Sequence, residues 1–155
     1  EPADFKARLI PYLQSAGVLG STVSDAESAI LDEAAPLIQE RITVLGEAPD
    51  MLSFLFKTTD EISIDDDARA GLPENSGEIA LAAAEKLGSV EESDFKTEHI
   101  QALLIEQMQL KPRVAFGPLR TAISGRRISP PLFESMQILG KAETVARLKA
   151  FAAAV

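Results

Sequence analysis

The chain has 155 residues, of which 46% are hydrophobic and 25% are charged, and its 24 acidic and 15 basic side chains give a net charge of −9. It has no Cys and one His, which excludes disulfides, thiolate metal sites, Cys nucleophiles and sites built on two His. No apolar run reaches the roughly 18 residues of a transmembrane helix, and the acidic start is unlike a signal peptide. Because the first residue is Glu, we expect a piece of a longer protein. Taken alone, the net charge argues against a polyanionic partner.

The net charge conceals an asymmetry along the chain. Residues 1–110 carry 7 basic and 22 acidic side chains, whereas residues 111–155 carry 8 basic and 2 acidic ones. A basic segment on an acidic protein points to nucleic-acid contact. The alternative is a solubilising surface with uneven charge, and charge alone leaves both open.

The many Ala and Leu residues and the scarcity of strand-like alternation predict an all-α fold. Ser24 and Glu27 have the spacing of a capping box, and Pro36 fits the first turn of the helix that follows. In chain order, the expected helices cover about 3–16, 24–35, 36–45, 50–57, 79–87, 95–109, 112–125 and 129–140, with a last one around Val145, Leu148 and Ala152.

Residues 58–71 interrupt this pattern, because they contain Asp65-Asp66-Asp67 and Gly71 but few large apolar side chains. We therefore predict two helical subdomains, residues 1–65 and residues 66–155. In the second, Ile100, Leu103, Leu104 and Met108 recur at helical spacing and predict one buried face.

Few residues in the chain can support catalysis. The Asp65–Asp67 cluster lacks the spaced oxygens of an EF-hand loop and is interpreted as a solvated turn, and His99 as an ordinary helix residue. Neither a phosphate-binding glycine loop nor a G-x-S-x-G motif is present. We therefore assign no catalytic, cofactor-binding or metal-binding residue.

The segment Lys111–Phe133 is more informative. Arginine side chains are forked donors that suit phosphates and base edges, and Ser129-Pro130-Pro131 predicts a helix start with outward-facing N–H groups. Such a rigid platform suits unstacked single-stranded bases. The alternative is purely structural: Gly125 and Ser129 are helix caps, and Arg126 and Arg127 are solvated.

Arg41 is the other residue of interest. On the expected helix 36–45 it falls within the apolar stripe formed by Leu37, Ile38, Ile42 and Leu45. An Arg in such a stripe pairs with a carboxylate or extends its charge to solvent, or it projects into a cleft to meet a ligand.

The chain resembles the C-terminal end of bacterial glutamyl-tRNA synthetases, most strongly over residues 111–148. The motifs that carry the resemblance are Pro118-Leu119-Arg120, Ser124-Gly125-Arg126, Ser129-Pro130-Pro131-Leu132-Phe133-Glu134, Leu139-Gly140-Lys141 and Ala146-Arg147-Leu148. The resemblance implies an all-α, cage-like anticodon-binding region of two subdomains. The parent is then a class I ligase that joins glutamate to tRNA with ATP and Mg²⁺. The HIGH-type and KMSKS-type motifs of its catalytic half are absent here, so this piece is expected to be inactive alone.

The resemblance also implies roles for particular residues. Arg120 contacts the first anticodon base with Leu132 nearby, and Ser129 and Pro130 read the central uracil. Arg41 is the candidate for the third base. Apart from the resemblance, we expect supporting RNA contacts from three further basic residues: Arg113, Arg126 and Arg127. We expect a cytoplasmic monomer that binds glutamate tRNA and no membrane. The alternative function is an α-helical protein-interaction domain with a basic face and no RNA role. A helix-turn-helix DNA reader fits less well, because the basic residues spread over several helices.

Overall fold

A computed structural model describes residues 2–109, 111–126 and 129–155 of the chain. The described residues form helices and turns with no strand, which confirms the all-α prediction. They fall into two compact units, Glu1–Lys57 and Thr58–Val155. The division thus lies between Lys57 and Thr58, whereas the sequence predicts it between residues 65 and 66. Among the described residues, no helix is long and apolar enough to cross a bilayer.

The first unit contains five helical segments: α1 (Pro2–Ser15), α2 (Asp25–Ile38), η1 (Leu45–Glu47), α3 (Ala48–Leu52) and η2 (Ser53–Phe56). The capping box predicted at the start of α2 is present, because the Glu27 backbone N–H donates to the Ser24 hydroxyl and the Ser24 N–H donates to the Glu27 carboxylate. The α1 and α2 helices pack against each other, and Leu9, Leu13 and Leu31 are fully buried. Burial of these leucines holds the unit together.

The predicted helix over 36–45 is wrong. Pro36 lies inside α2, and the helix ends at Ile38. A turn follows, in which the N–H groups of Arg41 and Ile42 both donate to the Ile38 carbonyl, at 2.8 and 3.1 Å. Proline has no backbone N–H, so Pro36 cannot donate to the carbonyl of Asp32, one turn earlier. Because Asp32 is exposed, the helix tolerates the loss of this hydrogen bond and continues past Pro36.

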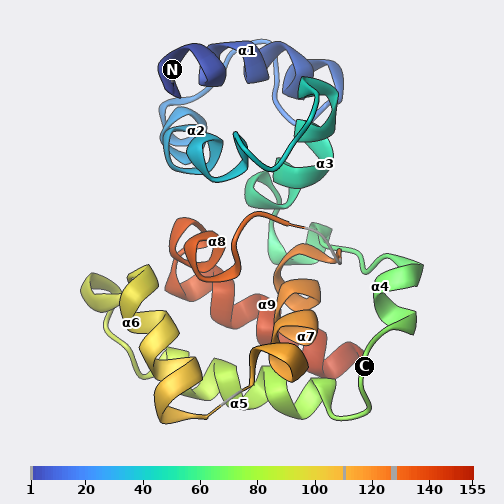
Figure 1. The fold of residues 1–155 in the computed structure, drawn as a ribbon, viewed down its shortest axis with the longest axis vertical. Helices are drawn as coiled ribbons and strands as arrows, with labels where there is room; N and C mark the ends of the chain where they lie inside the picture. Colours follow the sequence, from blue (N-terminus) through green and yellow to red (C-terminus); the bar gives the residue numbers. More distant parts are fainter. Residues whose placement is uncertain (1, 110, 127–128) are drawn as a thin grey trace. The chain divides into compact units, whose positions relative to one another are not determined.

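The second unit begins with two short segments, η3 (Thr59–Glu61) and α4 (Asp66–Ala70). The rest is α5 (Ser76–Gly88), η4 (Glu92–Asp94), α6 (Thr97–Gln101), η5 (Ala102–Gln107), α7 (Pro112–Ser124), α8 (Leu132–Leu139) and α9 (Lys141–Ala154). In Figure 1, α5 lies along α9 and α7 packs against both, while α6 packs against α8. Ala-rich faces such as Ala80, Ala83 and Ala84 of α5 allow this close approach.

The stripe predicted around residue 100 is confirmed in a modified form. Ile100, Leu103 and Leu104 are buried, and Met108 packs against the same core. The helix changes from α to π geometry at η5, so the Met108 N–H donates to the Leu103 carbonyl, five residues back, at 3.0 Å. The helix predicted to start at Ser129 instead begins at Leu132, with Pro131 as its N-cap residue.

The acidic cluster is exposed, as expected, but it begins a short helix and is not a turn, whereas the histidine is an ordinary helix residue, as expected. Asp65 is the N-cap residue of α4, and Asp66 and Asp67 lie in its first turn, where negative charge is favourable. His99 is exposed on α6. Among the described residues, no group of three or more potential ligands is placed to hold a metal ion.

Candidate functional site

The candidate site lies where α7 ends and the chain crosses to α8. Arg120, in the last part of α7, is half-buried, and its Nε donates to the Ser129 hydroxyl at 3.0 Å. The Ser129 hydroxyl in turn donates to the Pro130 carbonyl at 2.9 Å. The structure thus brings together three of the residues predicted from the sequence. Ser129 and Pro130 are buried, so the arginine is the member of this group with side-chain surface exposed to solvent.

Hydrogen bonds within residues 120–126 close part of the end of α7. The Ser124 hydroxyl donates to the Arg120 carbonyl at 2.7 Å and accepts from the Arg126 N–H at 3.1 Å. Gly125 has a φ of 78°, and its N–H donates to the Thr121 carbonyl at 2.7 Å. This left-handed residue ends the helix, as helix C-caps commonly do. The interpretation of Gly125 as a helix cap is therefore confirmed. A helix cap at Gly125 is also compatible with a role in presenting Arg120.

Leu132 does not lie on the surface. Its side chain is 3% exposed and belongs to the core of the second unit, together with Phe133. The Phe133 ring contacts Phe116 of α7 edge to face, with ring centroids 5.3 Å apart. Leu132 therefore helps to fix α8 beneath the site. The proximity of Leu132 to an anticodon base stays a prediction.

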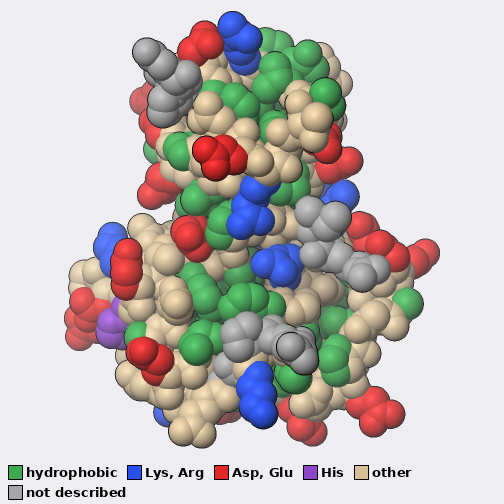
Figure 2. All heavy atoms as spheres, viewed as in Figure 1, with side chains coloured by type: hydrophobic (Ala, Val, Ile, Leu, Met, Phe, Trp, Pro, Cys, Tyr) green, Lys and Arg blue, Asp and Glu red, His purple; other side chains and the backbone are tan. Residues whose placement is uncertain are grey.

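The remaining predicted residues are spread over the chain. Arg126 is half-buried and forms an ion pair with Asp65, at 4.0 Å between Nε and the carboxylate. Arg113 lies on α7, but its side chain, like all of Arg127, is outside the described residues. Arg41 belongs to the other unit, and its side chain is exposed on the turn after α2, not within an apolar helix face. In the face shown in Figure 2, Lys and Arg side chains are dispersed among neutral and hydrophobic ones.

Sequence reasoning used Arg147 only as part of a family motif and missed its structural role behind the end of α7. This side chain is only 1% exposed, and its Nη1 donates to the Ile123 carbonyl at 2.6 Å. Its Nε donates to the Glu143 carboxylate at 2.8 Å, and the same carboxylate accepts from the Thr59 hydroxyl at 2.8 Å. The Glu143–Arg147 spacing of four residues on one helix was the available signal for an ion pair. The contact with Ile123, distant in sequence, left no such signal.

Two opposing effects set the protonation of this pair. Burial tends to raise the pKa of Glu143, but the hydrogen bonds from Arg147 and Thr59 and the positive charge of Arg147 outweigh it and lower this pKa below 4.5. Burial lowers the pKa of Arg147, and the Glu143 carboxylate partly opposes this decrease. The contact joins a carboxylate to a guanidinium, a group that keeps its proton in proteins.

The lowered pKa of Glu143 predicts a pH-dependent stability. A carboxyl with a lower pKa in the folded state stabilises the protein above its unfolded pKa, near 4.5, and this contribution is lost as the pH falls through the folded value. We expect the free energy of unfolding to fall more steeply in wild type than in Glu143→Gln between about pH 5 and pH 3. Urea unfolding of both proteins at a series of pH values measures this difference in steepness. Parallel curves for the two proteins would contradict the prediction.

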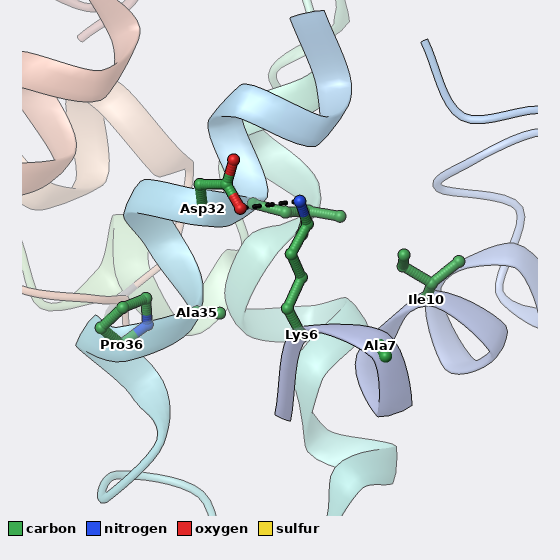
Figure 3. A pocket seen from close by; sticks show the side chains of 7 residues that line it. Lys6, Ala7, Ile10, Asp32, Ala35 and Pro36 are labelled. Carbon is green, nitrogen blue, oxygen red and sulfur yellow. Dashed lines mark hydrogen bonds and ion pairs between the residues drawn. The ribbon is translucent and has the colours of Figure 1, made fainter. Parts of the chain in front are cut away.

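A hollow lies in the first unit, between α1 and α2, with a volume of about 540 Å³. Figure 3 shows Lys6 extending from α1 toward Asp32 of α2, and the two groups are 2.7 Å apart. Lys6 also donates to the Ser28 hydroxyl at 2.7 Å. The rest of the lining is mainly apolar, including Ile10 and Leu31. These contacts join the two helices, so the lysine has a structural role here.

Comparisons with known proteins agree with this architecture. A sequence model of the family described as "Anticodon binding domain" matches residues 4–152. The chain is 59% identical over 152 residues to the "Glutamate--tRNA ligase" of Arthrobacter sp. (strain FB24), covering 96% of this chain and 30% of that protein. It is 54% identical over 159 residues to the enzyme of the same name from Leifsonia xyli subsp. xyli (strain CTCB07), covering 100% of this chain and 32% of that protein.

A solved structure shows the same fold. It is the crystal structure of a glutamate tRNA ligase from Elizabethkingia meningosepticum CCUG26117 in complex with its amino acid, with a TM-score of 0.71 and 22% sequence identity. The match covers 96% of this chain and 29% of that one. The chain thus spans about 30% of the length of the curated relatives it matches. Because the family model matches residues 4–152, the chain belongs to the anticodon-binding domain family.

Proposed function

We propose that this chain is a tRNA-binding module that recognises the anticodon loop of glutamate tRNA. The observation that carries the proposal is the pairing of Arg120 with Ser129 at the end of α7. It occurs in a chain whose family is described by anticodon binding. The alternative, a protein-interaction domain without an RNA role, is not favoured by any of these observations.

The geometry suits a base-directed contact for two reasons. Arg120 is half-buried, so its guanidinium is oriented by the protein and still partly accessible to solvent. Its Nε is held by a hydroxyl, which fixes the plane of the fork before a ligand arrives. Pre-orientation lowers the entropy that an arginine loses on binding a base edge. We propose Ser129 and Pro130 as the support of this arginine and as the reader of the central base.

Arg120→Ala tests the proposal directly. We expect the affinity of the full-length protein for a glutamate anticodon stem-loop to fall by about 1–3 kcal/mol, because a base-directed arginine is lost. Fluorescence anisotropy titration at fixed salt measures this change. Lys149→Ala, which removes one exposed positive charge from α9, is the matched control and should lose much less. Equal affinity of wild type for the cognate loop and a scrambled loop would refute the proposal.

For the whole protein we propose the activity that the names of its relatives state, ligation of glutamate to tRNA, with ATP and Mg²⁺ bound outside this chain. The relatives extend well beyond the matched segment, which leaves room for such a catalytic part. We further propose a cytoplasmic monomer. Arg41 remains the candidate for the third base, since an exposed side chain on a turn is accessible to RNA. Arg113, Arg126 and Arg127 remain candidates for supporting contacts.

A further inference from the structure

The buried guanidinium of Arg147 acts as a cap on α7 supplied by another helix. The last carbonyls of an α-helix have no partner within the helix. In α7, the Arg120 carbonyl accepts from Ser124 and the Thr121 carbonyl accepts from Gly125. The Ile123 carbonyl accepts from Arg147 of α9, and a positive charge at this end also opposes the helix dipole. One donor from α9 therefore fixes the turn of helix that follows Arg120.

The other donor of Arg147 reaches a second structure, the strap, which we define as residues 59–65. Arg147 Nε binds Glu143, and Glu143 accepts from Thr59 at the start of the strap. The far end of the strap returns to α7, because the Asp65 N–H donates to the Gly125 carbonyl at 2.8 Å. The Ser63 backbone carbonyl lies directly against Gly125. The end of α7 is thus held from α9 and from the strap, and Arg147 contributes to both.

We propose that Arg147 is a positioning residue for anticodon recognition, which it serves by fixing the last turn of α7 and thereby the direction of Arg120. This inference rests on the proposed function. Arg120 precedes Ile123 by one helical turn, so a shift of that turn moves the guanidinium relative to Ser129. Lysine has no fork, so Arg147→Lys cannot hold Ile123 and Glu143 in the same geometry. A positive charge is nevertheless retained in the buried position.

The test compares full-length wild type, Arg147→Lys, Arg120→Ala and the double variant in aminoacylation assays. Arg147→Lys is expected to raise the KM for glutamate tRNA about threefold to tenfold. The KM values for glutamate and ATP and the kcat should not change. A general loss of folded protein would lower kcat, so the two effects can be distinguished. In the Arg120→Ala background, Arg147→Lys should add no further increase, since its effect acts through Arg120.

The outcomes distinguish a failure of the positioning role of Arg147 from a failure of the proposed function. An effect of Arg147→Lys that adds fully to that of Arg120→Ala, or that lowers only kcat, would overturn the positioning role. If Arg120→Ala itself leaves the KM for tRNA unchanged, the proposed role of Arg120 has failed instead. Should Arg147→Lys not fold, as judged by circular dichroism, Glu143→Gln takes its place. It leaves the bond to Ile123 and loosens only the strap, so a smaller rise in the same KM is expected, again absent in the Arg120→Ala background.

Discussion

Arg147→Met is expected to lower the free energy of unfolding of the second unit by about 1–3 kcal/mol, because a buried carbonyl loses its donor and a partly exposed carboxylate loses its cation. The Met side chain fills most of the space but donates no hydrogen bond. The Glu143 carboxylate then loses its cationic partner, and the Ile123 carbonyl loses the donor it has from α9. Urea unfolding of the 155-residue chain, followed by far-ultraviolet circular dichroism, measures the change.

A double substitution shows where this loss arises. In Arg147→Met with Glu143→Leu, both members of the pair become apolar, and such replacements are often neutral or even stabilising. We therefore expect the double variant to be more stable than Arg147→Met alone. A cost below about 1 kcal/mol for Arg147→Met would contradict the prediction, because it would place the pair in the range of solvent-exposed ion pairs.

Gly125→Ala is expected to destabilise the second unit by about 2–3 kcal/mol, for two separate reasons. The φ of 78° disfavours any residue with a Cβ. A Cβ at this position would also collide with the Ser63 backbone carbonyl oxygen. Because that oxygen belongs to backbone, it cannot move aside as a side chain can, and the bond from Asp65 to the Gly125 carbonyl is strained with it. Urea unfolding again provides the measurement.

Gly17→Ala is the matched control. Gly17 has a φ of 80°, and a Cβ built there meets no atom within 4 Å. It should therefore cost only the backbone penalty of about 1 kcal/mol. If Gly125→Ala is no more destabilising than Gly17→Ala, the close approach of the strap to α7 is not rigid, and the second reason fails.

Local sequence signals predict much of this fold, and they fail where local signals compete. The capping box at Ser24 and the stripe ending at Met108 are formed as expected. Pro36 is ambiguous, because proline both begins helices and is tolerated within them at the loss of one hydrogen bond. The resulting error moved Arg41 onto an apolar helix face, although it lies on an exposed turn. Proline also explains the late start of α8, since Pro130 and Pro131 precede its first residue.

The candidate site, too, is only partly predictable from the sequence. The resemblance pointed to Arg120, Ser129 and Pro130, and the structure shows them linked by hydrogen bonds. Neither spacing nor resemblance indicated that Arg147 reaches Ile123 or that the Phe133 ring meets Phe116. These facts depend on how α7, α8 and α9 pack, and packing between helices far apart in sequence leaves no periodic trace in any one of them.

The two hydrogen bonds of the Ser129 hydroxyl have a thermodynamic consequence. This group already accepts from Arg120 and donates to Pro130 before any ligand arrives. A ligand that takes either role exchanges one hydrogen bond for another, and exchanged bonds contribute little net free energy. In the proposed role of Ser129 as a reader of the central base, most of its influence would therefore come from rejecting a mismatched ligand, one that displaces the internal bond and offers none in return. Discrimination at this position would arise from a penalty on the wrong partner more than from attraction to the right one.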